Sequence, residues 1–134
     1  MTGGDEGGDP RRRLGARGEE LAARHLEARG FEVVDRNFRT RYGELDVIAR
    51  DAGYLVFCEV KTRIVRASDA GSVLGPFAAI GQRKQRQVRA MAREWLAAGR
   101  LEGGFPPEIR FDAIGIRFDG RGRLLSLEHL EAAF

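Results

Sequence analysis

This chain of 134 residues has almost no cysteine: Cys58 stands alone, so no disulfide can form within the chain. That composition is compatible with a reducing cytosol, and we expect a cytoplasmic protein. Long apolar runs are missing as well, since no stretch approaches the roughly 20 residues needed to cross a bilayer. The N-terminus lacks the basic-then-apolar order of a signal peptide. We therefore expect no contact with a membrane.

Lysine is also scarce, and arginine supplies nearly all of the 23 basic side chains. The net charge is only +3, but the first ten residues carry three acids and no base, so the rest of the chain carries +6. Arginine is better suited than lysine to contacts with phosphate groups. The composition therefore permits a nucleic acid partner without requiring one.

The patterns that are present predict one α/β domain. Residues 1–10, rich in glycine and aspartate, are expected to form a disordered tail, and residues 11–134 to fold as a unit. Helical periodicity covers residues 11–29, closed by Gly30, and residues 81–98. Strands are expected at 31–38, twice within 43–63, at 109–118 and at 123–127, with a short helix at 128–134. This order favours a mixed central sheet of about five strands flanked by helices.

The most informative stretch is residues 43–63, with the sequence GELDVIARDAGYLVFCEVKTR. Residues 55–58 are continuously apolar, which indicates a central strand covered on both faces. Glu44 and Asp46 stand at the head of the preceding strand, while Glu59 and Lys61 follow the apolar run. Burying such charges is costly unless they have partners, a metal ion or a catalytic task.

The turn between these strands decides whether Asp46 and Glu59 meet. A two-residue loop at 52–53 places Asp46 opposite Glu59 on one face, whereas a three-residue loop places it opposite Cys58 on the other. In the first register the two carboxylates repel each other unless a cation lies between them, and Mg²⁺ or Mn²⁺ suits such ligands. Lys61 would then orient a water molecule or offset charge on a phosphate. A plain salt bridge from Lys61 to one of these acids is the alternative.

Asp46 followed by Glu59-x-Lys61 resembles the D…(D/E)-x-K signature of the restriction-endonuclease-like nuclease superfamily. The wider set of motifs resembles the YraN-like family of small bacterial proteins, which is itself similar to archaeal Holliday-junction resolvases. That set comprises Gly18-Glu19-Glu20, Gly43-Glu44-Leu45-Asp46 and residues 57–63, FCEVKTR. The match runs from about residue 14 to residue 134. One departure is Leu45, which stands where the superfamily motif has proline.

The resemblance implies a three-layer α/β sandwich and metal-dependent hydrolysis of phosphodiester bonds in DNA. It implies Asp46, Glu59 and Glu44 as metal ligands, with Lys61 completing the catalytic set. Glu19 is either a further catalytic carboxylate, as the matching helix glutamate is in resolvase-like relatives, or an acid that only complements its helix dipole. Branched DNA as substrate and a symmetric homodimer are implied by the resolvases alone.

Basic residues suited to nucleic acid lie on both sides of the motif. Arg39 and Arg41 alternate with two aromatic residues in an expected connection, residues 37–42. This pattern suits backbone contact and stacking with DNA or RNA, and equally suits a solvated turn. Arg63 follows the E-x-K tripeptide directly.

Gln82 and Lys84, near the start of the second helix, match a basic position of the family and are assigned to nucleic acid binding. Lys84 falls in line with the apolar stripe of that helix, so the alternative is that its stem merely extends along apolar surface. The irregular residues 64–80 are expected to form a loop that closes over a substrate. Arg110 and Asp112 share a strand face and are expected to pair with each other.

Together these patterns predict a nuclease that requires Mg²⁺ or Mn²⁺ and acts on DNA. The alternative is a module that keeps the nuclease fold and binds nucleic acid, or recruits a partner, without turnover.

Overall fold

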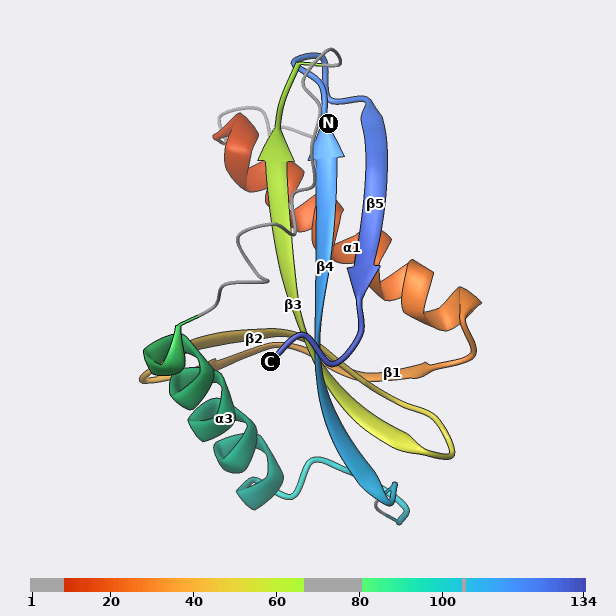
Figure 1. Ribbon diagram of the computed structural model, residues 1–134, viewed down its shortest axis with the longest axis vertical. Helices are drawn as coiled ribbons and strands as arrows, with labels where there is room; N and C mark the ends of the chain where they lie inside the picture. Colours follow the sequence, from red (N-terminus) through yellow and green to blue (C-terminus); the bar gives the residue numbers. More distant parts are fainter. Residues whose placement is uncertain (1–8, 67–80, 105) are drawn as a thin grey trace, which may run out of the picture.

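The computed structural model describes residues 9–66, 81–104 and 106–134. Within them, helices α1 (Pro10–Ala28) and α3 (Gln82–Ala97) enclose a five-stranded sheet in the order β1-β2-β3-β4-β5 (Figure 1). The strands are β1 (Glu32–Thr40), β2 (Gly43–Arg50), β3 (Tyr54–Ile64), β4 (Glu108–Phe118) and β5 (Leu124–Leu130). Of the neighbouring pairs only β3 and β4 are parallel, so the sheet is mixed. The predicted three-layer α/β sandwich is confirmed.

The sheet is buried on both faces because its strands carry apolar side chains in both directions. Ala22 and Leu26 of α1 pack with Val56 and Cys58 of β3 on one face. On the other face, Phe57 of β3 packs with residues of α3 that include Val88, Met91 and Trp95. The continuously apolar residues 55–58 are therefore a central strand, as their pattern predicts.

Helix α1 begins one residue earlier than expected, at Pro10. The carboxylate of Asp9 accepts a hydrogen bond from the backbone N–H of Arg11 at 3.0 Å and so caps the helix. Pro10 at the first helical position is favourable because its missing N–H would have no partner there. Gly30 follows the helix with a φ of +94°, the left-handed conformation expected of its C-terminal glycine. The rest of the expected tail, residues 1–8, lies outside the described residues.

The sheet divides between β2 and β3. Their ladder joins Arg50 to Leu55 at one end and Val47 to Cys58 at the other, which is the register of a two-residue loop at 52–53. Beyond Cys58, β3 continues to Ile64 beside β4, while β2 turns away with β1 (Figure 1). We call this divergence the fork.

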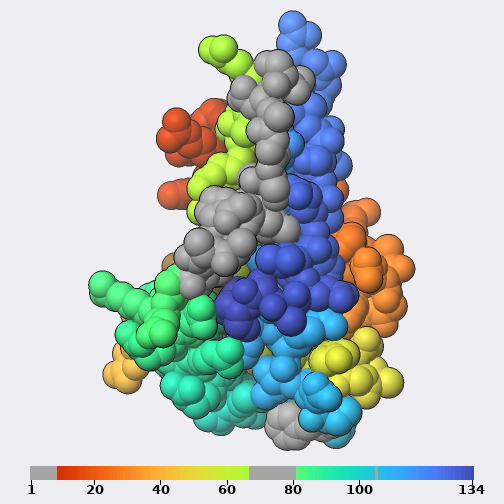
Figure 2. Space-filling model, in the orientation of Figure 1, coloured from red at the N-terminus to blue at the C-terminus, as the bar shows by residue number. Residues whose placement is uncertain are grey.

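Three expected boundaries are wrong. Strand β1 extends to Thr40, so most of the expected connection at 37–42 is strand. Ile64 belongs to β3, and residues 67–80 of the expected loop lie outside the described part of the chain. Residues 128–130 continue β5, and no helix forms after them. Phe134 still packs against Phe111, with ring centroids 5.7 Å apart, so the chain end covers the sheet beside α3 (Figure 2).

A buried carboxylate explains why the C-terminal residues do not form a helix. Asp112 of β4 is fully buried and accepts two hydrogen bonds from Arg110, both 2.8 Å long, which confirms the expected pair. It also accepts the backbone N–H of Ala132 at 3.0 Å and contacts Nε2 of His129 at 2.8 Å. The other ring nitrogen of His129 lies 3.0 Å from His25 of α1. These bonds hold the end of β5 and the turn at residues 131–132, where Ala132 has a φ of +50°, against β4.

No helix in the described part of the chain is both long and apolar enough to span a membrane.

Candidate metal centre

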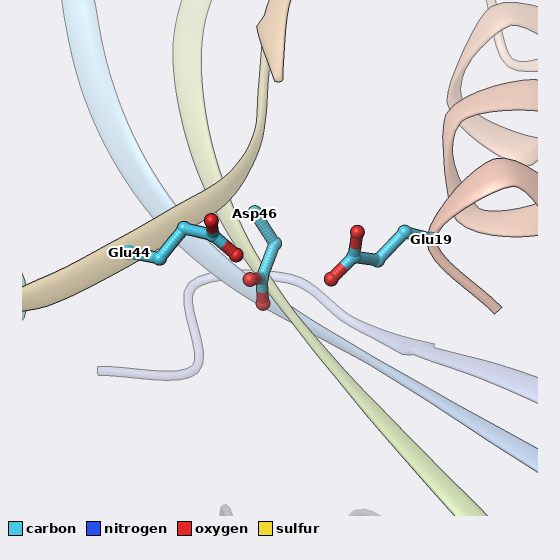
Figure 3. Close-up of side chains that lie close together, drawn as sticks. All are labelled: Glu19, Glu44 and Asp46. Atoms are coloured by element: carbon cyan, nitrogen blue, oxygen red, sulfur yellow. The ribbon is translucent and has the colours of Figure 1, made fainter. Parts of the chain in front are cut away.

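Three carboxylates from two layers converge in the fork. Glu19 projects from α1, and Glu44 and Asp46 from the start of β2 (Figure 3). One oxygen of each lies within 4.8 Å of the others, and all three side chains are partly buried. Such a group of hard oxygen ligands is suited to a divalent cation such as Mg²⁺ or Mn²⁺.

Asp46 is the centre of the group, between Glu19 and Glu44 (Figure 3). Its Oδ2 accepts the backbone N–H of Val60 at 2.8 Å, so the side chain bridges the fork one position after the ladder ends. Burial raises the pKa of Asp46 to about 7. The Val60 hydrogen bond opposes this rise, and the negative charges of Glu19, Glu59 and Glu44 add to it. The site therefore concentrates negative charge that a cation would relieve.

Asn37 holds two of these acids and was not identified from the sequence. Its side-chain amide donates to Glu19 at 2.8 Å and makes a longer contact of 3.4 Å with Glu44. The β1–β2 register places Asn37 opposite Asp46, and its φ of +54° is left-handed. Asparagine tolerates this backbone conformation better than most residues do. An asparagine within an otherwise ordinary strand pattern is the only signal that the sequence offers for it.

Glu59 lies at the fork but faces α3 rather than the tight group of three. Its Oε1 is 3.1 Å from Nζ of Lys84, so Lys84 points to the acids instead of only covering apolar surface. Its Oε2 is buried and has no hydrogen-bond partner among the described residues. Glu59, Glu44 and Asp46 all line a cavity of about 10 Å³, which is about the size of one water-sized sphere.

The remaining predicted residues lie at different distances from this centre. Arg39 pairs with Glu44 at 3.3 Å. Arg41 instead stacks on the ring of Tyr42, 4.9 Å from its centroid. Lys61 is partly buried and follows Glu59 on the same side of β3, because side chains alternate along a strand. Gln82 is the exposed first residue of α3.

Arg63, near the end of β3, is exposed and lines a groove that also contains Glu19. The neighbouring acid Glu20 is excluded from the centre because it pairs with Arg36 at 2.7 Å and with Arg24 at 3.1 Å. The structure thus brings Glu19, Glu44 and Asp46 together from α1 and β2 and leaves Glu20 outside. Glu59 lies nearby on the α3 side, so the expectation that the two-residue register would place it on one face with Asp46 is wrong, because the strands diverge at this point.

Most of the chain matches a known protein family. Residues 18–116, which include the four acids and both lysines, match the uncharacterised protein family UPF0102. A UPF0102 protein of Rhodococcus jostii is 47% identical over 121 residues, covering 90% of this chain and 95% of that protein. A UPF0102 protein of Anaeromyxobacter dehalogenans is 46% identical over 136 residues, covering 100% of this chain and 93% of that protein. The chain therefore belongs to the UPF0102 family, the YraN-like group that its motifs indicate.

Proposed function

We propose that this protein is a metal-dependent nuclease that hydrolyses phosphodiester bonds in DNA. The observation that carries the proposal is the fork, where Glu19 of α1 meets Glu44 and Asp46 of β2, with the Glu59–Lys84 pair on its α3 side. Glu44 pairs with the exposed Arg39, but Glu19 and Asp46 have no ion pair with an arginine among the described residues. Acids that served only the stability of the fold would be expected to have one, as Glu20 does. Here the chain keeps three carboxylates together at the end of a ladder.

The residues fit a hard divalent cation. Glu19, Glu44 and Asp46 would hold it, and the buried Oε2 of Glu59, which lacks a partner among the described residues, is available to a ligand in the small cavity. Bound there, Mg²⁺ or Mn²⁺ would supply a water of lowered pKa and a positive charge facing the phosphate. Val60 and Asn37 fix the orientation of Asp46 and Glu19 through their hydrogen bonds.

The two lysines of the chain have separate roles in this proposal. Lys84 is held 3.1 Å from Glu59 and limits the negative charge on the α3 side of the fork. Lys61 is the catalytic amine, which orients the attacking water or a phosphate oxygen. Lys84 approaches from α3 and Lys61 from β3, so neither lysine can replace the other.

The surface of α3 supports a polyanionic substrate. Its exposed side carries four arginines and its sequence a single acid, Glu94. These arginines are Arg83, Arg86, Arg89 and Arg93. Contacts of arginine with phosphates supply most of the sequence-independent affinity for nucleic acid. The resemblance to resolvases extends the proposal to branched DNA and to a homodimer. We also propose that the protein acts in the cytoplasm. The buried thiol of Cys58, whose pKa burial raises, is consistent with that reducing compartment.

The test is cleavage of linear, flapped and four-way DNA, and of matching RNA, with Mg²⁺ or Mn²⁺. Wild type should cut at least one DNA substrate, and Asp46→Asn or Lys61→Ala should lower the rate by about 100-fold or more. Both variants should still bind the same DNA in EDTA.

Glu19→Gln and Glu20→Gln form a matched pair on one helix. The first should lower cleavage and the second should leave it unchanged, because Glu20 is paired with arginines outside the fork. Salt-dependent binding by wild type with no cleavage of any substrate would instead establish the non-catalytic module.

A further inference from the structure

A groove of about 630 Å³ lies between α1 and the part of β3 beyond the fork. β2 has already turned away there, so β4 is the only described strand that pairs with this part of β3. Glu19, a member of the carboxylate group, lines the groove. The groove therefore opens directly beside the candidate metal centre.

The two ends of the groove have opposite charge. Glu19 lies near the fork, whereas Arg11, from the first turn of α1, and Arg63, from the end of β3, line the outer end. Both arginines are exposed, and no acidic partner for either occurs among the described residues. A chain of phosphates could thus contact the arginines while its next phosphate reaches the acids.

The lining between these ends is apolar and open. Leu14, Val60 and Ile64 line it, and Ile64 is 44% exposed. Gly15 also lines it, and a Cβ added there would meet nothing within 4 Å. At Gly18 the helix and strand are in contact, since a Cβ there would come within 2.3 Å of the Thr62 hydroxyl oxygen. The groove is thus open beside Gly15, closes at Gly18 and is partly apolar.

We propose that this groove binds a single-stranded segment of DNA next to the bond that is cut. Its phosphates contact Arg11 and Arg63, and its sugars and bases lie on Leu14 and Ile64. A paired duplex keeps its bases stacked inside, where this apolar surface cannot reach them, whereas an unpaired strand exposes them. From Val60 to Arg63 the strand rises about 10 Å, which corresponds to about three stacked nucleotides.

This inference deepens the proposed function and rests on it for the reaction, but its binding step can be measured alone. Gly15 supplies the sharpest test. Gly15→Leu fills the groove, while Gly15→Ala adds only one methyl group to the same helix position. Both changes replace a helical glycine by a better helix former, so a loss of binding will not come from unfolding. Thermal unfolding of both variants checks this.

The experiment measures fluorescence anisotropy of labelled oligothymidine and of a blunt duplex in EDTA. Gly15→Leu should bind the single strand about tenfold more weakly than Gly15→Ala, and both should bind the duplex as wild type does. Arg63→Gln should lower the salt dependence of single-strand binding by about 0.7 in the log–log slope, the share of one phosphate contact. Oligothymidine and oligouridine of equal length distinguish DNA from RNA, and tighter binding of oligouridine would overturn the assignment to DNA.

Equal single-strand binding by Gly15→Leu and Gly15→Ala would overturn the groove, even if wild type cuts DNA. A difference that persists while wild type cuts nothing would support the groove and refute the nuclease. An equal loss of duplex binding in Gly15→Leu would also count against a single-strand groove.

Discussion

At the scale of single residues, Asn37 and Asp112 show how one polar side chain can organise several elements. Asn37 joins Glu19 of α1 to Glu44 of β2, and it does so from a left-handed position in β1. Asp112 joins neighbouring residues of β4, β5 and the chain end. Asn37 therefore holds two carboxylates of like charge close together. Asp112 instead has its own buried charge stabilised by the hydrogen bonds that it accepts.

Replacing Asn37 separates its backbone role from its side-chain role. Asn37→Ala should lower the free energy of unfolding by about 1–3 kcal/mol, because alanine is strained at a φ of +54°. Asn37→Gly should recover about 1 kcal/mol of that loss, because glycine adopts this conformation freely. Both variants should bind Mn²⁺ equally weakly, since both lack the amide. Urea unfolding and calorimetric titration measure these effects, and equal stability of the two variants would show that the backbone is not strained.

Asp112 should give the protein a dependence on acid pH. Burial alone would raise the pKa of Asp112, but hydrogen bonds from His129, Arg110 and Ala132 outweigh it and lower the pKa. A carboxyl with a lowered folded pKa stabilises the fold above its unfolded pKa of about 4, and this contribution is lost as pH falls through the lower folded value.

Asp112→Ala should therefore cost about 3–5 kcal/mol at neutral pH, because it leaves Arg110 without its buried partner. The difference from wild type should narrow as pH falls below about 4. Urea titrations at a series of pH values measure it, and a difference that stays constant would mean that the charge of Asp112 is not what stabilises the fold.

At the scale of elements, α1 positions the site through a close contact with β3. A Cβ at Gly18 would overlap the side chain of Thr62, whereas a Cβ at Gly15, one turn earlier, would meet nothing within 4 Å. The same residue type thus has two functions in one helix. Gly18 lets the helix approach the strand, so that Glu19, its neighbour, reaches the fork.

Alanine at these two glycines should have opposite effects on stability. Gly15→Ala should stabilise by about 0.5–1 kcal/mol through helix propensity. Gly18→Ala should destabilise by about 1–3 kcal/mol, because the Cβ would overlap the Thr62 hydroxyl. Thr62→Ala in the Gly18→Ala background should recover part of the loss, and a double-mutant cycle from urea unfolding measures this coupling. Purely additive effects would refute the contact.

At the scale of the whole molecule, the acidic centre lies between the helix layer of α1 and the sheet. Repulsion among its carboxylates opposes the packing of these two layers. Its carboxylates belong to α1 and β2, with Glu59 of β3 close by. The repulsion among these carboxylates is present only when the protein is folded. A cation that binds there should therefore act on the stability of the whole fold.

Mn²⁺ should raise the melting temperature of wild type by about 5–10 °C at concentrations near 100 times its dissociation constant. Asp46→Asn should melt higher than wild type without metal, because it removes a buried charge near Glu19, Glu44 and Glu59. It should gain little from Mn²⁺. Differential scanning calorimetry at pH 8 measures both effects, with Glu20→Gln as the control that keeps the metal response. An equal response of Asp46→Asn and wild type would place the metal elsewhere.

Sequence periodicity was sufficient to predict most elements and most residues near the fork. Apolar residues 55–58 identify β3, Gly30 marks the end of α1, and the charges beside the apolar run identify Asp46 and Glu59. These features are local, because the apolar periodicity and the glycines of a segment determine its own secondary structure and its buried face. The end of β5 was predicted incorrectly because its form depends on a contact that is distant in sequence. Residues 128–134 have an ambiguous pattern, and their hydrogen bonds to Asp112 decide their form.

The tertiary structure alone decided which charges meet. The sequence left the register of β2 and β3 open and could not indicate that the strands diverge after Cys58. That divergence lets Asp46 reach Val60, brings Glu19 and Asn37 to the same place, and turns Glu59 toward Lys84. Chain pattern determines which surfaces are buried, whereas the meeting of side chains from separate elements depends on the angle at which those elements part.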